Sequence, residues 1–286
     1  MAFGELRAAV AEPGELLGRL SALDGVWIVG GWLRDHWLGR RTMDIDLAVQ
    51  GEIGPVLARL AELYGSSPFE IGLRHGSHRL VCDGAMIDIS PLYGAGIGED
   101  LARRDYTVNS LALPARLLGT QISPGDVLQH EQTASDLQDG MLRAVSRRNL
   151  ASDPLRILRG YRLSAQLGFA VESGTRQAWR SLATAVTGSA GERIHEELLR
   201  LLNVTRSAAP YIGMLAEDGV LWQLMPELRP MVGCEQNAYH HLDVWTHTLE
   251  CLAALDQLRQ SYPAALAGFA AELDAALAAP ESGLAS

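Results

Sequence analysis

Residues 26–49 read VWIVGGWLRDHWLGRRTMDIDLAV, a pattern that predicts a strand, a glycine turn, a short helix and a second strand. The apolar run at 26–29 is short and ends at two glycines, as a buried strand before a turn does. Apolar residues within 32–38 follow helical spacing. Residues 44–49 alternate between polar and apolar side chains, which is typical of a strand with one buried face.

Two acids, Asp44 and Asp46, lie two positions apart in the second predicted strand. Such residues point to the same face of a strand, roughly 6–7 Å apart. Neighbouring carboxylates repel each other unless a cation lies between them, and Mg²⁺ binds carboxylates together with substrate phosphates. Gly30 and Gly31 allow the backbone to approach a phosphate, and the N-terminus of the following helix favours an anion. This strand–helix–strand unit therefore predicts a site for a metal ion and a triphosphate.

A third acid, Asp88, lies between two isoleucines in a predicted strand at 85–90. A second short strand is predicted at 79–82, and Asp83-Gly84 between the two is a hairpin signal. A single acid on a strand commonly faces solvent. The alternative is that Asp88 is a third carboxylate that faces Asp44 and Asp46, and the residues alone leave both interpretations open.

The composition limits the class of protein. The chain has 286 residues and a net charge of −10, and all 24 of its basic residues are arginine. This charge argues against indiscriminate coating of nucleic acid, although it permits a local basic groove. No apolar run reaches the ~18–20 residues of a membrane helix, and the N-terminus lacks a secretory signal. Three widely separated cysteines without a CxxC pair indicate no zinc site, so we expect a reducing, cytoplasmic location.

Two arginine-rich segments stand out. In the segment EDLARRDYTVNSLAL at 99–113, Asp100 and Arg104 have the spacing of a helical ion pair, and Thr107 is placed to cap a second helix at 108–113. Further along, Asp153 and a following proline predict the start of another helix, with Asp153 as its cap. Taken alone, the charged residues at 103–105 are also compatible with a plain surface charge cluster that has no functional role.

The helix that follows Asp153 carries Arg156, Arg159 and Arg162 within an arc of about 120°. These arginines form either a solvated face or a row that contacts a triphosphate and base edges, because guanidinium groups offer planar paired donors. The remaining pattern is helical. The predicted helices are at 176–182, 191–202, 210–224 and 237–280, with breaks at Pro226, Pro230 and Gly233.

Three residues near the C-terminal end, His240, Asp243 and His247, have a spacing that places them on one helix face. Metal-dependent RNA phosphohydrolysis is therefore one possible activity. Hydrolases of the HD type also need a His-Asp dipeptide, and the chain has no such pair. Helix capping and packing are the expected roles of these residues.

These segments resemble, in the same order, the motifs of class II tRNA nucleotidyltransferases and bacterial poly(A) polymerases. The resembling segments are 30–35, 38–40, 44–46, 103–112, 153–162 and 237–248. The resemblance implies an α+β protein, in which a polymerase-β-like nucleotidyltransferase palm, a small mixed sheet with helices, precedes an all-α neck, body and tail. The implied boundaries are 1–145 for the head, 146–232 for the neck and body that select the nucleotide and bind RNA, and 233–286 for a tail like the start of an HD domain, but incomplete.

The resemblance also implies roles for individual residues. The implied catalytic acids are Asp44, Asp46 and Asp88, of which Asp44 and Asp46 are the metal ligands. The implied nucleotide contacts are Gly31, Arg34, Arg104, Asp153, Arg156, Arg159 and Arg162. Among these, Asp153 and Arg156 match the pair that selects C or A by imitating the edge of a base. A carboxylate accepts from an exocyclic amine and arginine donates to ring acceptors, so this role is physically reasonable.

The implied activity is template-free addition of C, either alone or followed by A, to the 3′ end of tRNA from CTP and ATP, with two Mg²⁺ ions and release of pyrophosphate. The tRNA acceptor and elbow region would be the bound partner. Two departures matter. Ser152 occupies the position of a family glutamate, and the segment at 90–98 is shorter than the flexible loop of CCA-adding members. Members that add only CC lack that loop, which favours a CC product over full CCA addition, A addition or poly(A) synthesis. A non-catalytic RNA-binding protein is the alternative from another class.

Overall fold

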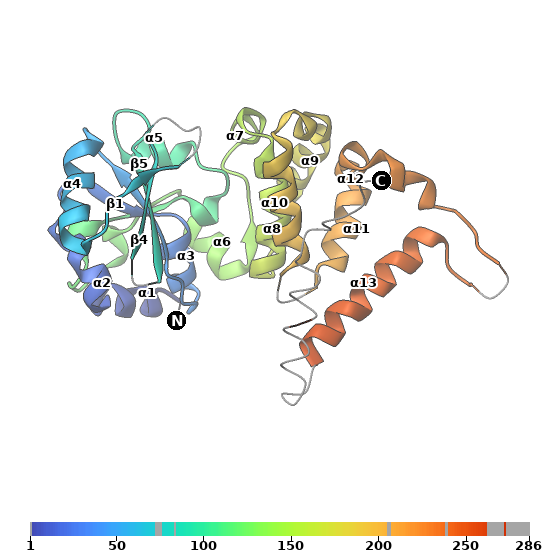
Figure 1. The fold of residues 1–286 in the computed structure, drawn as a ribbon, viewed down its shortest axis with the longest axis horizontal. Helices are drawn as coiled ribbons and strands as arrows, with labels where there is room; N and C mark the ends of the chain where they lie inside the picture. Colours follow the sequence, from blue (N-terminus) through green and yellow to red (C-terminus); the bar gives the residue numbers. More distant parts are fainter. Residues whose placement is uncertain are drawn as a thin grey trace. The chain divides into compact units, whose positions relative to one another are not determined.

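A computed structural model describes residues 2–71, 76–82, 84–204, 207–237, 240–261 and 272 (Figure 1). The chain forms two compact units. Unit 1 consists of Met1–Ser152 with Phe169–Thr175, and unit 2 consists of Asp153–Gly168 with Arg176–Ser286. The finer division into head, neck, body and tail stays a prediction.

Unit 1 is built on a seven-stranded sheet, counted within the described residues, in the order β3-β4-β5-β2-β1-β6-β7. The strands are β1 (Val26–Val29), β2 (Asp44–Val49), β3 (Phe69–Glu70), β4 (His78–Cys82), β5 (Ala85–Pro91), β6 (Leu111–Pro114) and β7 (Leu128–Gln129). Strands β2 and β5 are parallel, and the other neighbouring pairs are antiparallel. The predicted small mixed sheet and the α+β class are therefore confirmed.

Strand β2 has the predicted alternation over its first half. Ile45 and Leu47 are buried, whereas Asp44 and Asp46 are exposed. Ala48 lies on the same face as the acids but is buried, because the helix α5 (Ile97–Ala102) packs over this end of the sheet with its apolar side chains. The acids therefore lie on the part of this sheet face that α5 leaves uncovered.

The helices of unit 1 follow the sequence pattern in most places. They are α1 (Ala2–Ala11), α2 (Gly14–Gly18), α3 (Gly31–Trp37), α4 (Ile53–Tyr64), α5, α6 (Thr133–Asp139) and α7 (Arg147–Ser152). The glycine turn followed by a short helix is confirmed by α3. The glycine turn also shows why it needs glycine, since Gly30 has a φ of +70°.

The predicted helix at 108–113 is wrong. Thr107–Asn109 forms a single 3₁₀ turn, and the chain then enters β6. Leu111 and Leu113 are fully buried, and β6 pairs with β1 through the register Ile28 to Leu113. Burial in the sheet overrides the local helical pattern here. The Asp83 position of the expected hairpin turn lies outside the described residues.

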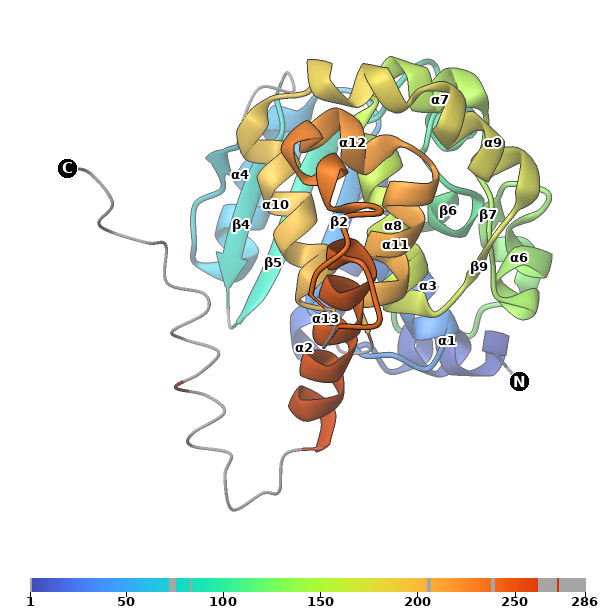
Figure 2. The ribbon, with the colours of Figure 1, turned by 90° about the vertical axis from the view of Figure 1, so that its right-hand side faces the viewer.

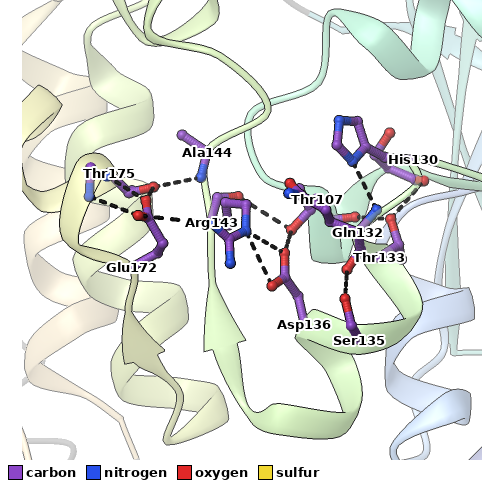
Figure 3. Close-up of polar contacts among 12 residues, drawn as sticks. Thr107, His130, Gln132, Thr133, Ser135, Asp136, Arg143, Ala144, Glu172 and Thr175 are labelled. Carbon is purple, nitrogen blue, oxygen red and sulfur yellow. Dashed lines mark hydrogen bonds and ion pairs between the residues drawn. The ribbon is translucent and has the colours of Figure 1, made fainter.

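Thr107 contributes to a buried polar cluster instead of capping a helix (Figure 3). Its hydroxyl donates to Asp136 at 2.7 Å, and Arg143 Nε donates to the same carboxylate at 3.1 Å. Arg143 also lies 3.8 Å from Glu172, which accepts the amide and the hydroxyl of Thr175. These contacts hold α6 against the two-stranded pair β8 (Met141–Leu142) and β9 (Ala170–Val171), which closes unit 1.

Unit 2 is helical. Its helices are α8 (Leu155–Leu167), most of α9 (Ser173–Ser181), α10 (Gly191–Leu202), α11 (Ala209–Glu217), α12 (Val220–Leu224) and α13 (Val244–Ser261). Helices α11 and α13 pack against each other, as both views show (Figures 1 and 2). Asp256 of α13 accepts the Ala208 amide at 2.7 Å and so caps the N-terminus of α11.

Three helix predictions in unit 2 need correction. The single helix expected at 210–224 is two helices, because Gly219 adopts a φ of +77° between α11 and α12. Helix α8 has Pro154 rather than Asp153 at its N-cap position. The last helix begins at Val244 rather than at 237, and most of its predicted continuation to residue 280 lies outside the described residues. Among the described helices, none is both long and apolar enough to cross a membrane.

One carboxylate organises the interior of unit 2. The side chain of Asp218 is fully buried and accepts the Tyr161 hydroxyl at 2.8 Å. Arg176 Nε at 2.9 Å and Arg180 Nε at 2.7 Å donate to the same carboxylate. The ring of Trp179 packs on Tyr161 with centroids 4.4 Å apart. Removal of this charge would leave two arginines without their shared partner.

We therefore predict that Asp218→Ala lowers the free energy of unfolding by about 3–5 kcal/mol, the usual cost of breaking a buried ion pair from one side. Urea unfolding, followed by the fluorescence of Trp179 and the other tryptophans, measures this change. The matched control is Glu217→Gln, which removes an exposed partner of Arg176 and should cost less than about 1 kcal/mol. Equal losses in the two variants would contradict the assignment of Asp218 as the organising charge.

Candidate active site

The three predicted catalytic acids lie on one face of the sheet in unit 1. Strand register in the parallel pair β2–β5 places Asp46 directly opposite Asp88. Asp44 and Asp46 are two positions apart in β2, so both point to this face. Of the two interpretations that the sequence left open for Asp88, the geometry is that of an acid beside Asp46. Its catalytic role stays a prediction.

Arg79 on β4 is a residue of this face that the sequence did not reveal. It lies opposite Asp88 in the antiparallel pair β4–β5. Its Nε and Nη2 atoms donate to the two Asp88 oxygens at 2.7 and 2.9 Å. The hydrogen bonds that Arg79 donates to Asp88 raise the pKa of Arg79, and the negative charges of Asp88, Asp44 and Asp46 act in the same direction against the opposing effect of burial. A lone arginine in a five-residue strand carries no sequence signal, because its importance depends on cross-strand register.

Gly30 is where the turn after β1 meets the acids. A Cβ atom at this position would lie 2.9 Å from Arg104 Nη1 and 3.8 Å from Asp46 Oδ2. The Arg104 guanidinium is held by Asp100 at 2.9 Å, which confirms the expected contact four residues apart. The positive φ at residue 30 favours glycine, and a side chain there would also push the Arg104 guanidinium out of its position beside the turn.

Arg34, on α3, lies in a buried network. It is 9 % exposed and donates to both Asp35 oxygens at 2.9 Å and to Asn109 Oδ1. Asn109 in turn donates to Asp105 at 3.1 Å, and Asp105 is buried. The surface-cluster interpretation of residues 103–105 is therefore wrong for Asp105. Helix α3, which begins at Gly31, is tied to the segment after α5 by this network, and the predicted contact of Arg34 with a triphosphate stays a prediction.

The arginine row of unit 2 has a buried partner. Glu197 of α10, 5 % exposed, accepts Arg162 Nε at 2.6 Å and lies 3.7 Å from Arg159 Nε. Burial lowers the pKa of Arg162, and the Glu197 carboxylate opposes that effect. The solvated-face interpretation is wrong for Arg162, whose side chain is only 12 % exposed. The same helix α10 carries Arg193, which lies 3.4 Å from the Asp153 carboxylate.

The two units thus hold separate parts of the predicted site. Unit 1 contains Gly31, Arg34, Asp44, Asp46, Asp88 and Arg104, and unit 2 contains Asp153, Arg156, Arg159 and Arg162. Ser152 lies at the position where the resemblance places a glutamate. Its hydroxyl donates to the backbone carbonyl of Asn149 at 2.8 Å.

The donor chemistry of the acid face fits a hard divalent cation. Asp44 and Asp46 offer two exposed carboxylates on adjacent positions of one face. Within the described parts of the chain, no group of three or more His, Cys, Asp or Glu residues is arranged to hold a metal by protein ligands alone. Mg²⁺ commonly uses one or two carboxylates and completes its shell with water and substrate phosphates. The two acids therefore suffice for a metal that arrives with a nucleotide.

The histidines near α13 do not form a comparable site. His240 lies before the helix, so the expected common helix face with His247 is wrong. Asp243 accepts the amides of Gly233 at 2.6 Å and Thr246 at 2.7 Å, and the expected capping role is confirmed. The side-chain hydrogen bond from Thr246, together with the bonds from these two amides, lowers the pKa of the Asp243 carboxyl.

Comparison with family models gives two matches. Residues 26–92 match the poly A polymerase head domain, and residues 168–231 match the probable RNA and SrmB-binding site of polymerase A. The first match contains the acid face and the second covers much of unit 2.

Similar proteins carry several product specificities. The chain is 37 % identical over 231 residues to a CC-adding tRNA nucleotidyltransferase of Thermus thermophilus, covering 78 % of this chain and 50 % of that protein. It is 36 % identical over 236 residues to an A-adding tRNA nucleotidyltransferase of Deinococcus radiodurans, covering 81 % and 52 %. The chain thus spans about half the length of these relatives.

Known structures agree on the fold. A Thermotoga maritima CCA-adding enzyme complexed with tRNA has a TM-score of 0.66 at 21 % identity, over 96 % of this chain and 72 % of that chain. A CCA-adding enzyme with ATP has a TM-score of 0.64 at 21 % identity, over 92 % and 69 %. With its motifs in order, its head model and its RNA-binding model, the chain belongs to the family of poly(A) polymerases and tRNA nucleotidyltransferases.

Proposed function

We propose that the chain is a cytoplasmic tRNA nucleotidyltransferase that adds C to the 3′ end of tRNA from CTP and releases pyrophosphate. The observation that carries this proposal is the exposed pair Asp44 and Asp46, next to the Arg104 guanidinium, on the open face of a head-type sheet. Enzymes of this family are generally metal-dependent, and the oxygen donors of the two acids favour Mg²⁺ as the metal.

In this mechanism the predicted site residues of unit 1 have separate roles. Asp44 and Asp46 hold the metal ions at the uncovered part of the sheet face. When bound by these two acids, Mg²⁺ would lower the pKa of the attacking 3′-hydroxyl and would offset the negative charge on the leaving oxygens. Arg104, fixed by Asp100, presents positive charge to the triphosphate beside Gly30. The buried network of Arg34 keeps the turn at Gly31 rigid, so that the phosphates meet a preorganised site.

Selection of the nucleotide belongs to unit 2. Asp153 and Arg156 provide an acceptor and donors that match the edge of cytosine or adenine. Arg159 and Arg162 contact the nucleotide with guanidinium groups that Glu197 orients from behind. The relatives from Thermus and Deinococcus carry different product names, so overall similarity alone does not choose between C and A.

The segment between β5 and α5 favours a CC product. Asp100 accepts the Tyr93 amide at 3.2 Å, and Glu99 accepts the Ala95 amide at 3.2 Å. Gly94 has a φ of +81°, and a Cβ atom there would clash with Glu99. This short loop is fastened to the start of α5 at two points. It therefore lacks the length and freedom that we associate with a loop that must rearrange between C and A addition.

The proposed RNA partner is the tRNA 3′ end with its acceptor and elbow region. The match of residues 168–231 to an RNA-binding model supports an RNA contact in unit 2. The Thermotoga enzyme complexed with tRNA has the same fold as this chain and supports the same class of RNA.

We predict that Asp46→Asn reduces incorporation of labelled CTP into tRNA lacking its 3′ end by at least about a thousandfold, since loss of a metal ligand removes several kcal/mol of transition-state stabilisation. The structural control is Asp139→Asn, an exposed acid at the end of α6, which should keep normal activity. Near-normal incorporation by a folded Asp46→Asn protein would reject the proposed function.

A second prediction concerns the product. Incubation of the same tRNA with CTP alone, ATP alone or both, followed by sequencing of the 3′ ends, should give two added C residues whenever CTP is present. We expect no terminal A in the mixed reaction, because two hydrogen bonds fasten the short loop at 92–96 to the start of α5 and oppose its rearrangement. A terminal A added after CC would reject the CC-only product. A parallel reaction with tRNA that already ends in CC tests the A-adding alternative, which would be favoured if this tRNA gains A while the tRNA lacking its 3′ end gains no C.

A further inference from the structure

Both oxygens of Asp88 are already occupied by Arg79. The two contacts are short, at 2.7 and 2.9 Å, and join parallel N–H donors to the two carboxylate oxygens. This fork-to-fork geometry is the strongest form of an arginine–carboxylate pair. The two side chains are 35 % and 34 % exposed, so they lie at the surface of the sheet and not in its core.

The charges across the acid face follow from strand register. Asp46, Asp88 and Arg79 form one row over the adjacent strands β2, β5 and β4. Arg79 therefore neutralises the outer acid of the row and leaves Asp44 and Asp46 as the exposed negative charges. A divalent cation bound to Asp88 would share that carboxylate with the Arg79 guanidinium. The two positive charges would then lie close together and repel each other.

We propose that Arg79 is a positioning residue that keeps Asp88 out of the metal-ligand set, so that Asp44 and Asp46 alone supply the carboxylates. The inference rests on the proposed function only in requiring that these two acids bind a divalent cation. It assigns Asp88 a supporting role. The Asp88–Arg79 pair borders the metal site without adding net charge to it, which limits how tightly the metal is held in the absence of a nucleotide.

The test is a double-mutant cycle on Arg79 and Asp88, in which the dissociation constant for Mn²⁺ is measured instead of catalytic turnover. Free Mn²⁺ gives a sharp electron paramagnetic resonance signal that is lost on binding, so the dissociation constant of the full chain can be titrated directly. Arg79→Met leaves Asp88 as an uncompensated acid and should tighten Mn²⁺ binding about tenfold. Asp88→Asn leaves the guanidinium uncompensated and should weaken binding about tenfold.

The double variant Arg79→Met/Asp88→Asn decides between the alternatives. It restores a neutral pair, so its dissociation constant should return to within about twofold of the unmodified protein. If Asp88 is instead a metal ligand, the double variant will bind Mn²⁺ as weakly as Asp88→Asn, and the inference is overturned. Arg79→Gln, which also removes the charge but keeps a donor to Asp88, repeats the test if the methionine variant unfolds. Thermal unfolding of each variant checks the fold.

Two further controls separate this inference from the proposed function. Arg59→Met removes an exposed arginine paired with Glu62 on α4 and should leave Mn²⁺ binding unchanged. Arg79→Lys keeps the positive charge but loses the paired hydrogen bonds, and its Mn²⁺ dissociation constant should stay close to that of the unmodified protein because the charge beside Asp88 is retained. Asp44→Asn/Asp46→Asn must abolish binding. If binding survives in that variant, the proposed metal site itself is wrong, whatever the Arg79 variants show.

Discussion

The parallel pairing of β2 with β5 is the constraint on which the proposed chemistry depends. It is the one parallel pair among the neighbouring strands of the seven-stranded sheet in the described residues, and its register sets Asp46 beside Asp88. A slip by one residue would turn Asp44 and Asp46 into the core. The buried Ile45 and Leu47 prevent such a slip, because exposing them would lose their apolar burial. The hydrophobic pattern of β2 therefore fixes where its charges lie.

Much of unit 1 could be predicted because its signals are local. Alternation in β2, the two glycines before α3 and the amphipathic pattern of α4 each report their own conformation. Arg79 could not be found in this way, since only the register of β4 against β5 brings it to Asp88. The false helix at 108–113 has the same origin. Its apolar spacing was compatible with a helix, but the partner strand β1 was not visible in the local sequence.

Buried acids explain why the arginines are where they are. The sequence offered a choice between a solvated arginine face and a nucleotide-reading row, and neither included Glu197 on a separate helix. In unit 2, Asp218 and Glu197 each hold two arginines, and in unit 1 the buried Asp136 holds Arg143. The Asp218, Glu197 and Asp136 pairs orient guanidinium groups within the fold, while Asp44 and Asp46 remain exposed for metal and substrate.

In the proposed arrangement Asp44 and Asp46 bind the metal, while Arg79 stays paired with Asp88 and keeps it from becoming a metal ligand. Anomalous diffraction from crystals of the chain grown with Mn²⁺ and CTP tests this claim most directly. The account predicts an anomalous peak at about 2.0–2.3 Å from carboxylate oxygens of Asp44 and Asp46, with the Arg79–Asp88 pair unbroken. A peak ligated by Asp88 with Arg79 displaced, or no peak on this face of the sheet, would contradict it.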